Sequence, residues 1–223
     1  MVKRLVFTTL FLFSMIVLTA CTSEPGFMRS ADSDHGINSQ PALKVVLDPG
    51  HGGKDGGATG VSGQFEKDFT LCVAKKVEKL LKAEAHIDVF MTRTEDRFIS
   101  QESRYRPNYA NQLNADLFIS IHGNTFFDPE VTGTETYYYH ENSRLLAKTI
   151  QEHVSHATGF RDRGIMKKDL FVVKDTQMPA ALVEIGYLTN PDDEAKMWTD
   201  DFQNRVANSI VEAIKEYKQK AGT

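Results

Sequence analysis

The sequence predicts one α/β domain over residues 42–223, with a mostly parallel, twisted sheet of about six strands flanked by helices on both faces. From Leu43 onward, short β-rich runs alternate with helical patterns, which is typical of βαβ units. The strand candidates are apolar at consecutive positions, as strands covered on both faces are. The chain of 223 residues is 41% hydrophobic and 25% charged, which is ordinary for a single well-cored domain.

The first half of this domain supplies three strand candidates and two helix candidates. The strands are "KVVLD" at 44–48, "IDVFMT" at 87–92 and "DLFISIH" at 116–122. The first helix is predicted from about Glu66 to Ala83, and the second near Ser100 to Leu113.

The second half continues the alternation with three further strands and three helices. The strand candidates are "GTETYYYH" at 133–140, "DLFVV" at 169–173 and "AALVEIG" at 180–186. Amphipathic helices are predicted at 143–157 and at about 202–217. Between the last strand and the last helix, "TNPDDE" opens a short helix, because Pro191 and the acids that follow it suit a first helical turn.

Residues 1–20 have the three-part pattern of a secretory signal. Lys3 and Arg4 precede an apolar stretch from Leu5 to Val17, and small residues follow. A transmembrane anchor is the alternative, but the ending "LTAC" resembles the lipobox of bacterial lipoproteins, in which the cysteine carries lipid. We therefore expect lipidation of Cys21 and a flexible tether over 21–41.

These features predict an exported protein anchored in a membrane on the cell-wall side. That membrane is either the cytoplasmic membrane, at its outer face, or an outer membrane, at its periplasmic face. Net charge is −4 and the lysines are scattered among acids, so no basic surface is expected to bind nucleic acid.

The stretch "LDPGHGGKDGGATG" ends the first strand in one histidine surrounded by glycines. Such a loop suits either a phosphate cradle of backbone N–H groups or a metal site with His51 as first ligand. Its spacing matches neither Gly-x-x-x-x-Gly-Lys-Ser/Thr nor Gly-x-Gly-x-x-Gly, so the metal interpretation is favoured.

Three predicted strands end in a titratable side chain: His51, His122 and Glu184. Ligands of α/β sheets gather at the carboxyl ends of the strands. A lone histidine there is more often a hydrogen-bonded structural residue, but a glutamate inside an apolar strand is costly to bury without a partner. Together the three residues indicate a site.

A hydrolytic zinc site needs three protein ligands and one open position, and two histidines with a glutamate are a recurrent set. Glu66 is the candidate third ligand, because it starts the helix that follows the glycine loop. A simple charge at the helix N-terminus explains Glu66 equally well. Three aspartates remain rival oxygen donors that spacing does not rank: Asp48, Asp55 and Asp68.

Four ordered motifs then give a family resemblance. The segments "LDPGHGGKDGGATG…EKD", "TR", "R…AN…ADLFISIHGN" and "PAALVEIGYLTNP" resemble the zinc-dependent N-acetylmuramoyl-L-alanine amidases of family 3, from about Lys44 to Tyr217. The resemblance implies one zinc ion held by His51, Glu66 and His122, with Glu184 as the catalytic residue. It also implies hydrolysis of the amide between the lactyl group of N-acetylmuramic acid and L-alanine in peptidoglycan, the activity of an autolysin.

Arg93, Arg106 and Asn124 fall on family positions that could hold substrate or orient a ligand, although arginines pairing with nearby acids explain them as well. Gly123 stands where many members have alanine. Only about ten residues separate His122 from "GTETYYY", whereas division-associated members carry a blocking helix there. We therefore expect a site that is open without an activator protein, in a monomer whose partner is peptidoglycan.

Two rival functions remain. One is a lipid-anchored peptidoglycan-binding protein without hydrolysis, which the presence of all four family residues disfavours. The other is a different zinc amidohydrolase of the cell wall, such as a deacetylase, or a metallopeptidase, whose HExxH signature is absent.

Overall fold

The computed structural model describes residues 42–222. The predicted signal segment 1–20, the tether 21–41 and the lipidation site Cys21 lie outside these residues. Among the described helices, none combines the length and the apolar character needed to span a bilayer.

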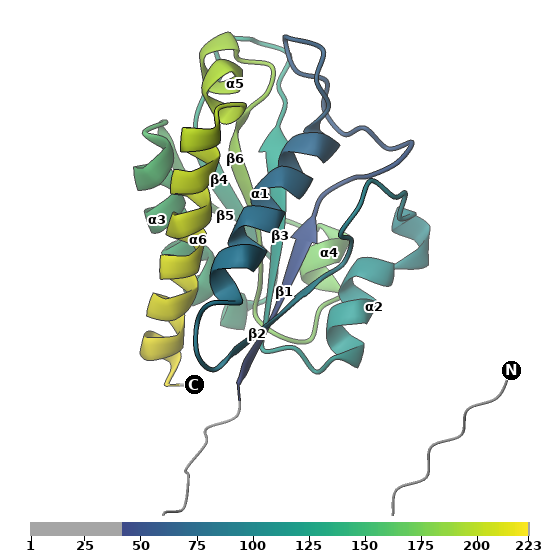
Figure 1. Cartoon of the computed structure of the whole chain (residues 1–223), viewed down its shortest axis with the longest axis vertical. Coiled ribbons are helices and arrows are strands. Elements are labelled where there is room, and N and C mark those ends of the chain that lie inside the picture. Colours follow the sequence, from purple (N-terminus) through teal and green to yellow (C-terminus); the bar gives the residue numbers. More distant parts are fainter. Residues whose placement is uncertain (1–41, 223) are drawn as a thin grey trace, which may run out of the picture. The chain divides into compact units, whose positions relative to one another are not determined.

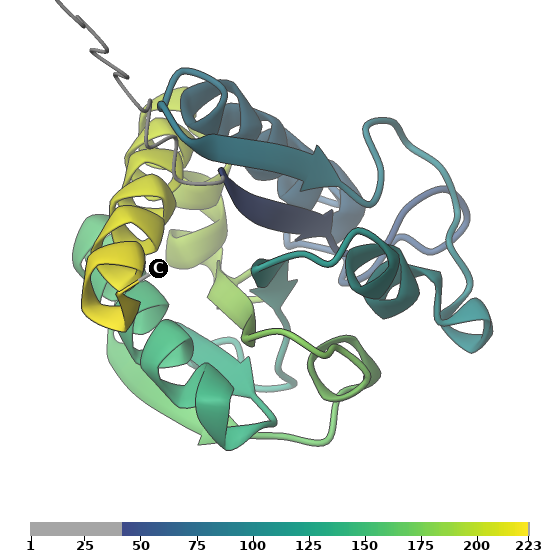
Figure 2. The ribbon, with the colours of Figure 1, turned by 90° about the horizontal axis from the view of Figure 1, so that it is seen from below.

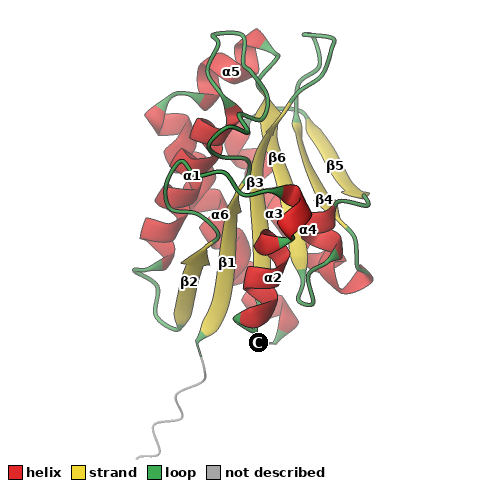
Figure 3. Cartoon of the chain, turned by 90° about the vertical axis from the view of Figure 1, so that its right-hand side faces the viewer, coloured by secondary structure: helices red, strands yellow, loops and turns green. Residues whose placement is uncertain are grey.

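The centre of the domain is a six-stranded sheet in the order β2-β1-β3-β6-β4-β5 (Figures 1 and 3). Neighbouring strands run parallel except for β4 and β6, which are antiparallel. The predicted mostly parallel sheet of about six strands is thus confirmed. The strands are β1 (Leu43–Pro49), β2 (Ile87–Met91), β3 (Leu117–Asn124), β4 (Thr134–Tyr138), β5 (Asp162–Lys167) and β6 (Ala180–Tyr187).

Helices cover both faces of the sheet, as Figure 2 shows from below. One face packs against three long helices: α1 (Glu66–Leu81), α3 (Arg144–Thr158) and α6 (Asp200–Ala221). The other face is covered by two shorter ones, α2 (Tyr105–Gln112) and α4 (Phe171–Lys174). This double cover explains why the central strands are apolar at consecutive positions.

The side chains of each central strand alternate between two hydrophobic clusters. In β1, Val45 and Leu47 face the long helices, whereas Val46 faces α2 and α4. In β6, Val183 and Leu182 divide in the same way. Side chains alternate between the two faces of a strand, so Asp48, His122 and Glu184 lie on the face that α2 and α4 cover.

The "TNPDDE" segment forms the predicted short helix, α5 (Pro191–Met197). Its cap is Asn190, whose side chain accepts hydrogen bonds from the backbone N–H groups of Asp192 and Asp193, with proline in the first turn. The helix predicted near 100–113 is in fact two pieces, because Arg104 adopts a left-handed backbone (φ 52°) between a 3₁₀ turn at Gln101–Ser103 and α2.

One predicted strand is wrong. The "DLFVV" run overlaps α4, and the sixth strand is instead β5, with the sequence "DRGIMK". An apolar run this short has no periodicity that distinguishes strand from helix. The true strand lies at the sheet edge and carries charged residues, which is usual for edge strands and hides them from a search for apolar runs.

Candidate active site

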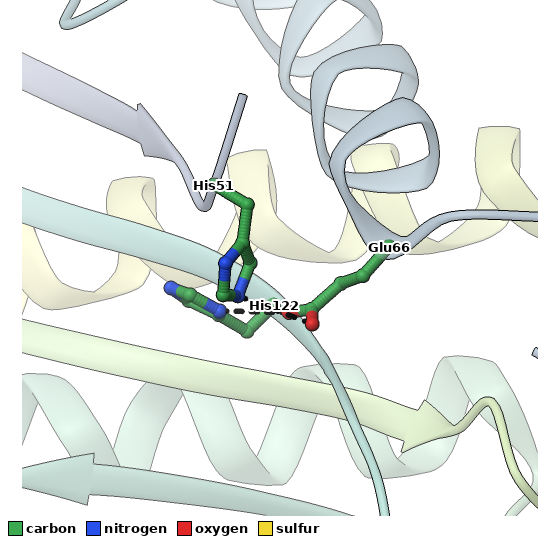
Figure 4. A group of neighbouring side chains, drawn as sticks. All are labelled: His51, Glu66 and His122. Carbon is green, nitrogen blue, oxygen red and sulfur yellow. Dashed lines mark hydrogen bonds and ion pairs between the residues drawn. The ribbon is translucent and has the colours of Figure 1, made fainter. Parts of the chain in front are cut away.

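His51, Glu66 and His122 come together at the carboxyl ends of β1 and β3 (Figure 4). His51 follows β1, His122 lies near the end of β3, and Glu66 is the first residue of α1. Nε2 of His51 lies 3.1 Å from Oε2 of Glu66, and Nδ1 of His122 lies 2.8 Å from Oε1. One ligand atom from each residue lies within 4.8 Å of the others, so the three could hold a single ion.

The Glu66 carboxylate is held in its charged form. Burial alone would raise its pKa, but hydrogen bonds to both imidazoles lower it well below its usual range. Backbone N–H groups of Ala58 and Gly123 also donate to its two oxygens, at 2.8 and 3.1 Å. Two imidazole nitrogens and a charged carboxylate are a donor set that fits zinc.

None of the three rival aspartates belongs to the group that could hold the ion. Asp48 is buried beneath the site in an ion pair with Arg106, at 2.7 Å. Asp68 is exposed on α1. Asp55 contacts the outer nitrogen of the His51 ring, since its Oδ1 lies 2.9 Å from Nδ1. The other ring nitrogen, Nε2, faces Glu66. Such an outer carboxylate fixes the tautomer of a metal-binding histidine.

Two glycines of the "GHGGKDGG" loop are required by close contacts. A Cβ atom at Gly50 would overlap the imidazole ring of His122. At Gly57, which has φ +69°, a Cβ atom would lie 2.5 Å from Oε2 of Glu66 and 2.7 Å from the ring of His51. The glycines therefore let the loop pass against the three side chains.

Glu184 lies beside the three-residue group, because it pairs in register with His122 on the neighbouring strand. Its Oε2 atom is buried and has no hydrogen-bond partner within residues 42–222. Burial raises the pKa of Glu184 well above its usual value, and the nearby carboxylates of Glu66 and Glu135 raise it further. A raised pKa makes this carboxylate a stronger base than an ordinary glutamate.

Glu184 opens on a cavity of about 220 Å³ on the face of α2 and α4. His51 and His122 line the cavity on one side, and residues of α4 and of the segment before α2 line the other. The sequence did not single out these wall residues: Ile99, Gln101, Leu170, Phe171 and Val172. The cavity gives a substrate access to the histidines and to Glu184 together.

Glu135 is a further residue near the site that the sequence did not indicate. It lies opposite Glu184 in the β4–β6 pairing and is only 4% exposed. Its Oε1 atom accepts hydrogen bonds from Nδ2 of Asn124 at 2.7 Å and from the Tyr187 hydroxyl at 2.6 Å. The sequence did hold a signal for Glu135, because residues two apart in a strand share a face. Tyr137 of the "GTETYYYH" strand is a buried core residue, so Glu135 is an acid on a buried face.

The two arginines singled out by the sequence are buried and engaged by the protein. Arg93, 2% exposed, donates to the backbone carbonyls of Pro49, Gly50 and Lys67. Arg106 pairs with Asp48 and lines the floor of the cavity. These contacts fit the structural alternative, in which the arginines hold the loop that carries His51.

Comparisons with known proteins agree with this geometry. The family described as N-acetylmuramoyl-L-alanine amidase matches residues 45–216. This match covers nearly the whole described domain, including all the residues of the site. The chain therefore belongs to the N-acetylmuramoyl-L-alanine amidase family, as its motifs predicted.

Relatives and solved structures show the same likeness. The chain is 42% identical over 177 residues to the uncharacterized protein YqiI of Bacillus subtilis, covering 78% of this chain and 84% of that protein. It is 33% identical over 189 residues to the probable cell wall amidase LytH of Staphylococcus aureus, covering 84% of this chain but only 62% of LytH. The catalytic domain of the amidase CwlV from Bacillus (Paenibacillus) polymyxa superposes with a TM-score of 0.77 at 42% identity, covering 79% of this chain and 98% of that domain.

Proposed function

We propose that this protein is a zinc-dependent N-acetylmuramoyl-L-alanine amidase, which hydrolyses the amide between the lactyl group of N-acetylmuramic acid and L-alanine of the stem peptide. The observation that carries the proposal is the placement of an unpaired, buried carboxyl oxygen of Glu184 beside the His51, Glu66 and His122 group. Family membership supports the choice of this amide bond.

His51, Glu66 and His122 would hold one zinc ion, with Asp55 fixing the ring of His51. Bound there, zinc would polarise the amide carbonyl and lower the pKa of a coordinated water. Glu184 accepts the proton of the attacking water and delivers it to the nitrogen of the departing L-alanine amine. Its raised pKa favours the first step, because a more basic carboxylate takes the proton of the water more readily.

The loop between β3 and β4 supports a site that works without an activator protein. In the structure this segment, residues 125–133, contains no helix. The end of this segment is held by α5, since Asp193 accepts hydrogen bonds from the Thr132 hydroxyl at 2.6 Å and from the Gly133 backbone N–H at 3.3 Å. We propose that the enzyme acts as a monomer on peptidoglycan.

We also propose that the enzyme acts from a membrane surface on the cell-wall side, attached by lipid at Cys21. The support for this placement is the sequence "LTAC" after an apolar segment. Metabolic labelling with a fatty-acid analogue tests it. Label on the wild-type chain and none on Cys21→Ser is the expected result, and equal labelling of the two would contradict it.

Mass spectrometry of purified sacculi treated with the zinc-loaded protein tests the activity. Free stem peptides beginning with L-alanine, on glycan strands that keep their acetyl groups, are the expected products. Loss of acetyl groups instead would indicate a deacetylase. Unchanged sacculi that retain bound protein would indicate a wall-binding protein without hydrolysis.

A further inference from the structure

A cationic surface lies next to Glu184 on the same face of the sheet. Glu135 and Tyr137 of β4 pair with Glu184 and Leu182 of β6, so all four side chains lie on the face of α2 and α4. On its other side β4 pairs with β5, the edge strand of the sheet (Figure 3). Three cations from β5 and the residue after it lie over aromatic rings of this region: Arg163, Lys167 and Lys168.

Lys168 is held over the sheet by Tyr137. Its ammonium nitrogen lies 3.8 Å from the centre of the Tyr137 ring, and its backbone N–H donates to the Tyr138 carbonyl at 2.9 Å. A cation over an aromatic face at this distance is favourably placed. Lys168 forms no ion pair with any carboxylate of residues 42–222. Its charge is therefore available to a ligand.

Arg163 differs from Lys168 because it faces an acid. Its guanidinium lies 5.5 Å from the centre of the Tyr187 ring, and its Nε atom lies 3.9 Å from Oε1 of Glu135. Glu135 thus offsets much of the Arg163 charge. Lys167 and Lys168 form no ion pair within residues 42–222, and Lys168 is the one that lies over Tyr137, where its charge acts on Glu184.

Lys168 is also close, along the chain, to a residue that lines the active-site cavity. Leu170, two residues further along the chain, lines that cavity. Tyr137, beneath the ammonium group, is one strand across and two residues along from Glu184. Standard sheet spacings of about 4.8 Å between strands and about 3.3 Å per residue place these two Cα atoms about 8 Å apart. An extended peptide covers that distance in two to three residues.

We propose that Lys168 binds a carboxylate of the stem peptide, on the peptide side of the scissile amide and one or two residues beyond L-alanine. The inference rests on the proposed amidase function, which places the scissile bond beside Glu184. A stem peptide continues past L-alanine with a glutamate that carries either a free carboxylate or its amide. Lys168 makes the enzyme prefer the free carboxylate, because an ammonium group attracts the charged form more strongly than the neutral amide.

The test uses two matched ligands that differ only in that group, a stem peptide with the free carboxylate and one with the amide. Each is titrated calorimetrically into the full chain in detergent, and the corresponding muropeptides are assayed for cleavage. We expect the wild type to favour the carboxylate form about tenfold in both Kd and kcat/KM, as for one charge-assisted hydrogen bond. Lys168→Met removes this preference. The control is Lys148→Met, which makes the same charge change at an exposed lysine of α3, on the opposite face of the sheet. This control variant is expected to keep the preference for the carboxylate form.

Equal affinity of the wild type for the two peptides, or an unchanged preference in Lys168→Met, overturns the inference, and so does the absence of binding to either peptide. A failure of the proposed amidase function gives a different result. In that case neither muropeptide is cleaved by the wild type, whatever the two peptides show in the titration.

Discussion

The carboxylate of Asp55 contacts Nδ1 of His51 at 2.9 Å, and the opposite ring nitrogen of the same histidine lies 3.1 Å from Glu66. Asp55 therefore determines which nitrogen of His51 faces the proposed metal. This relationship gives a residue outside the ligand set a measurable effect on metal binding.

Asp55→Ala is expected to weaken zinc affinity by about 10- to 100-fold, because the ring of His51 loses the partner that fixes its tautomer and orientation. Competition with a chromogenic chelator measures the change. Asp68→Ala is the matched control, since it removes an exposed aspartate of α1. Equal zinc affinities in the two variants would show that Asp55 does not act through His51.

Gly50→Ala is expected to disrupt the site, since the added methyl group would overlap the ring of His122. Overpacking of this kind costs about 1–3 kcal/mol of folding free energy, and the displaced ring also lowers zinc affinity. Gly123→Ala is the control, because its Cβ would meet only side-chain ends, of Leu188 and Met197, at 3.1 Å. Thermal unfolding with and without zinc checks both variants. A normal zinc-induced rise in Tm for Gly50→Ala would contradict the expected contact.

Asp48 is expected to make stability depend on pH in the acid range. Burial alone would raise its pKa, but Arg106 and hydrogen bonds from Thr92 and Ser120 lower it below the ordinary value of about 3.9. A carboxyl group with a depressed folded-state pKa stabilises the protein above its ordinary pKa. That contribution is lost as pH falls below about 4 towards the folded-state value.

Asp48→Asn is therefore expected to destabilise the protein by about 3–5 kcal/mol at pH 7, because the buried Arg106 charge loses its partner. The variant should also lose less stability than the wild type between pH 4 and pH 2. Urea unfolding at several pH values measures both effects, with exposed Asp88→Asn in β2 as control. A pH dependence of Asp48→Asn as steep as that of the wild type would exclude Asp48 as its source.

The sequence was most informative where strands are covered on both faces. Apolar runs identified β1, β3 and β6, and the polar residues that end them identified His51, His122 and Glu184. By contrast, β5 escaped detection, because an edge strand packed on one side needs few apolar residues. The "DLFVV" run was wrongly predicted as a strand because the short helix that it enters, α4, has only four residues, too few to show a period.

The sequence predicted where the site residues lie along the strands better than it predicted which side chains they contact. Spacing left Glu66 and three aspartates as rivals, since it does not reveal that α1 directs Glu66 between the two imidazoles. The role of Asp55 as the outer partner of His51 depends on a loop geometry that glycines make possible. The proximity of Glu135 to Glu184 depends on the antiparallel register of β4, which sequence alone does not fix.

In the proposed mechanism, His51, Glu66 and His122 hold the zinc while Glu184 moves the proton. Zinc content and stem-peptide release, measured together on Glu184→Gln and Glu66→Gln, test this division most directly. We predict that Glu184→Gln keeps about one zinc per chain and loses about 10²- to 10⁴-fold in activity, whereas Glu66→Gln loses the zinc. Glu184→Gln that remains active, or Glu66→Gln that retains zinc as tightly as the wild type, would contradict the account.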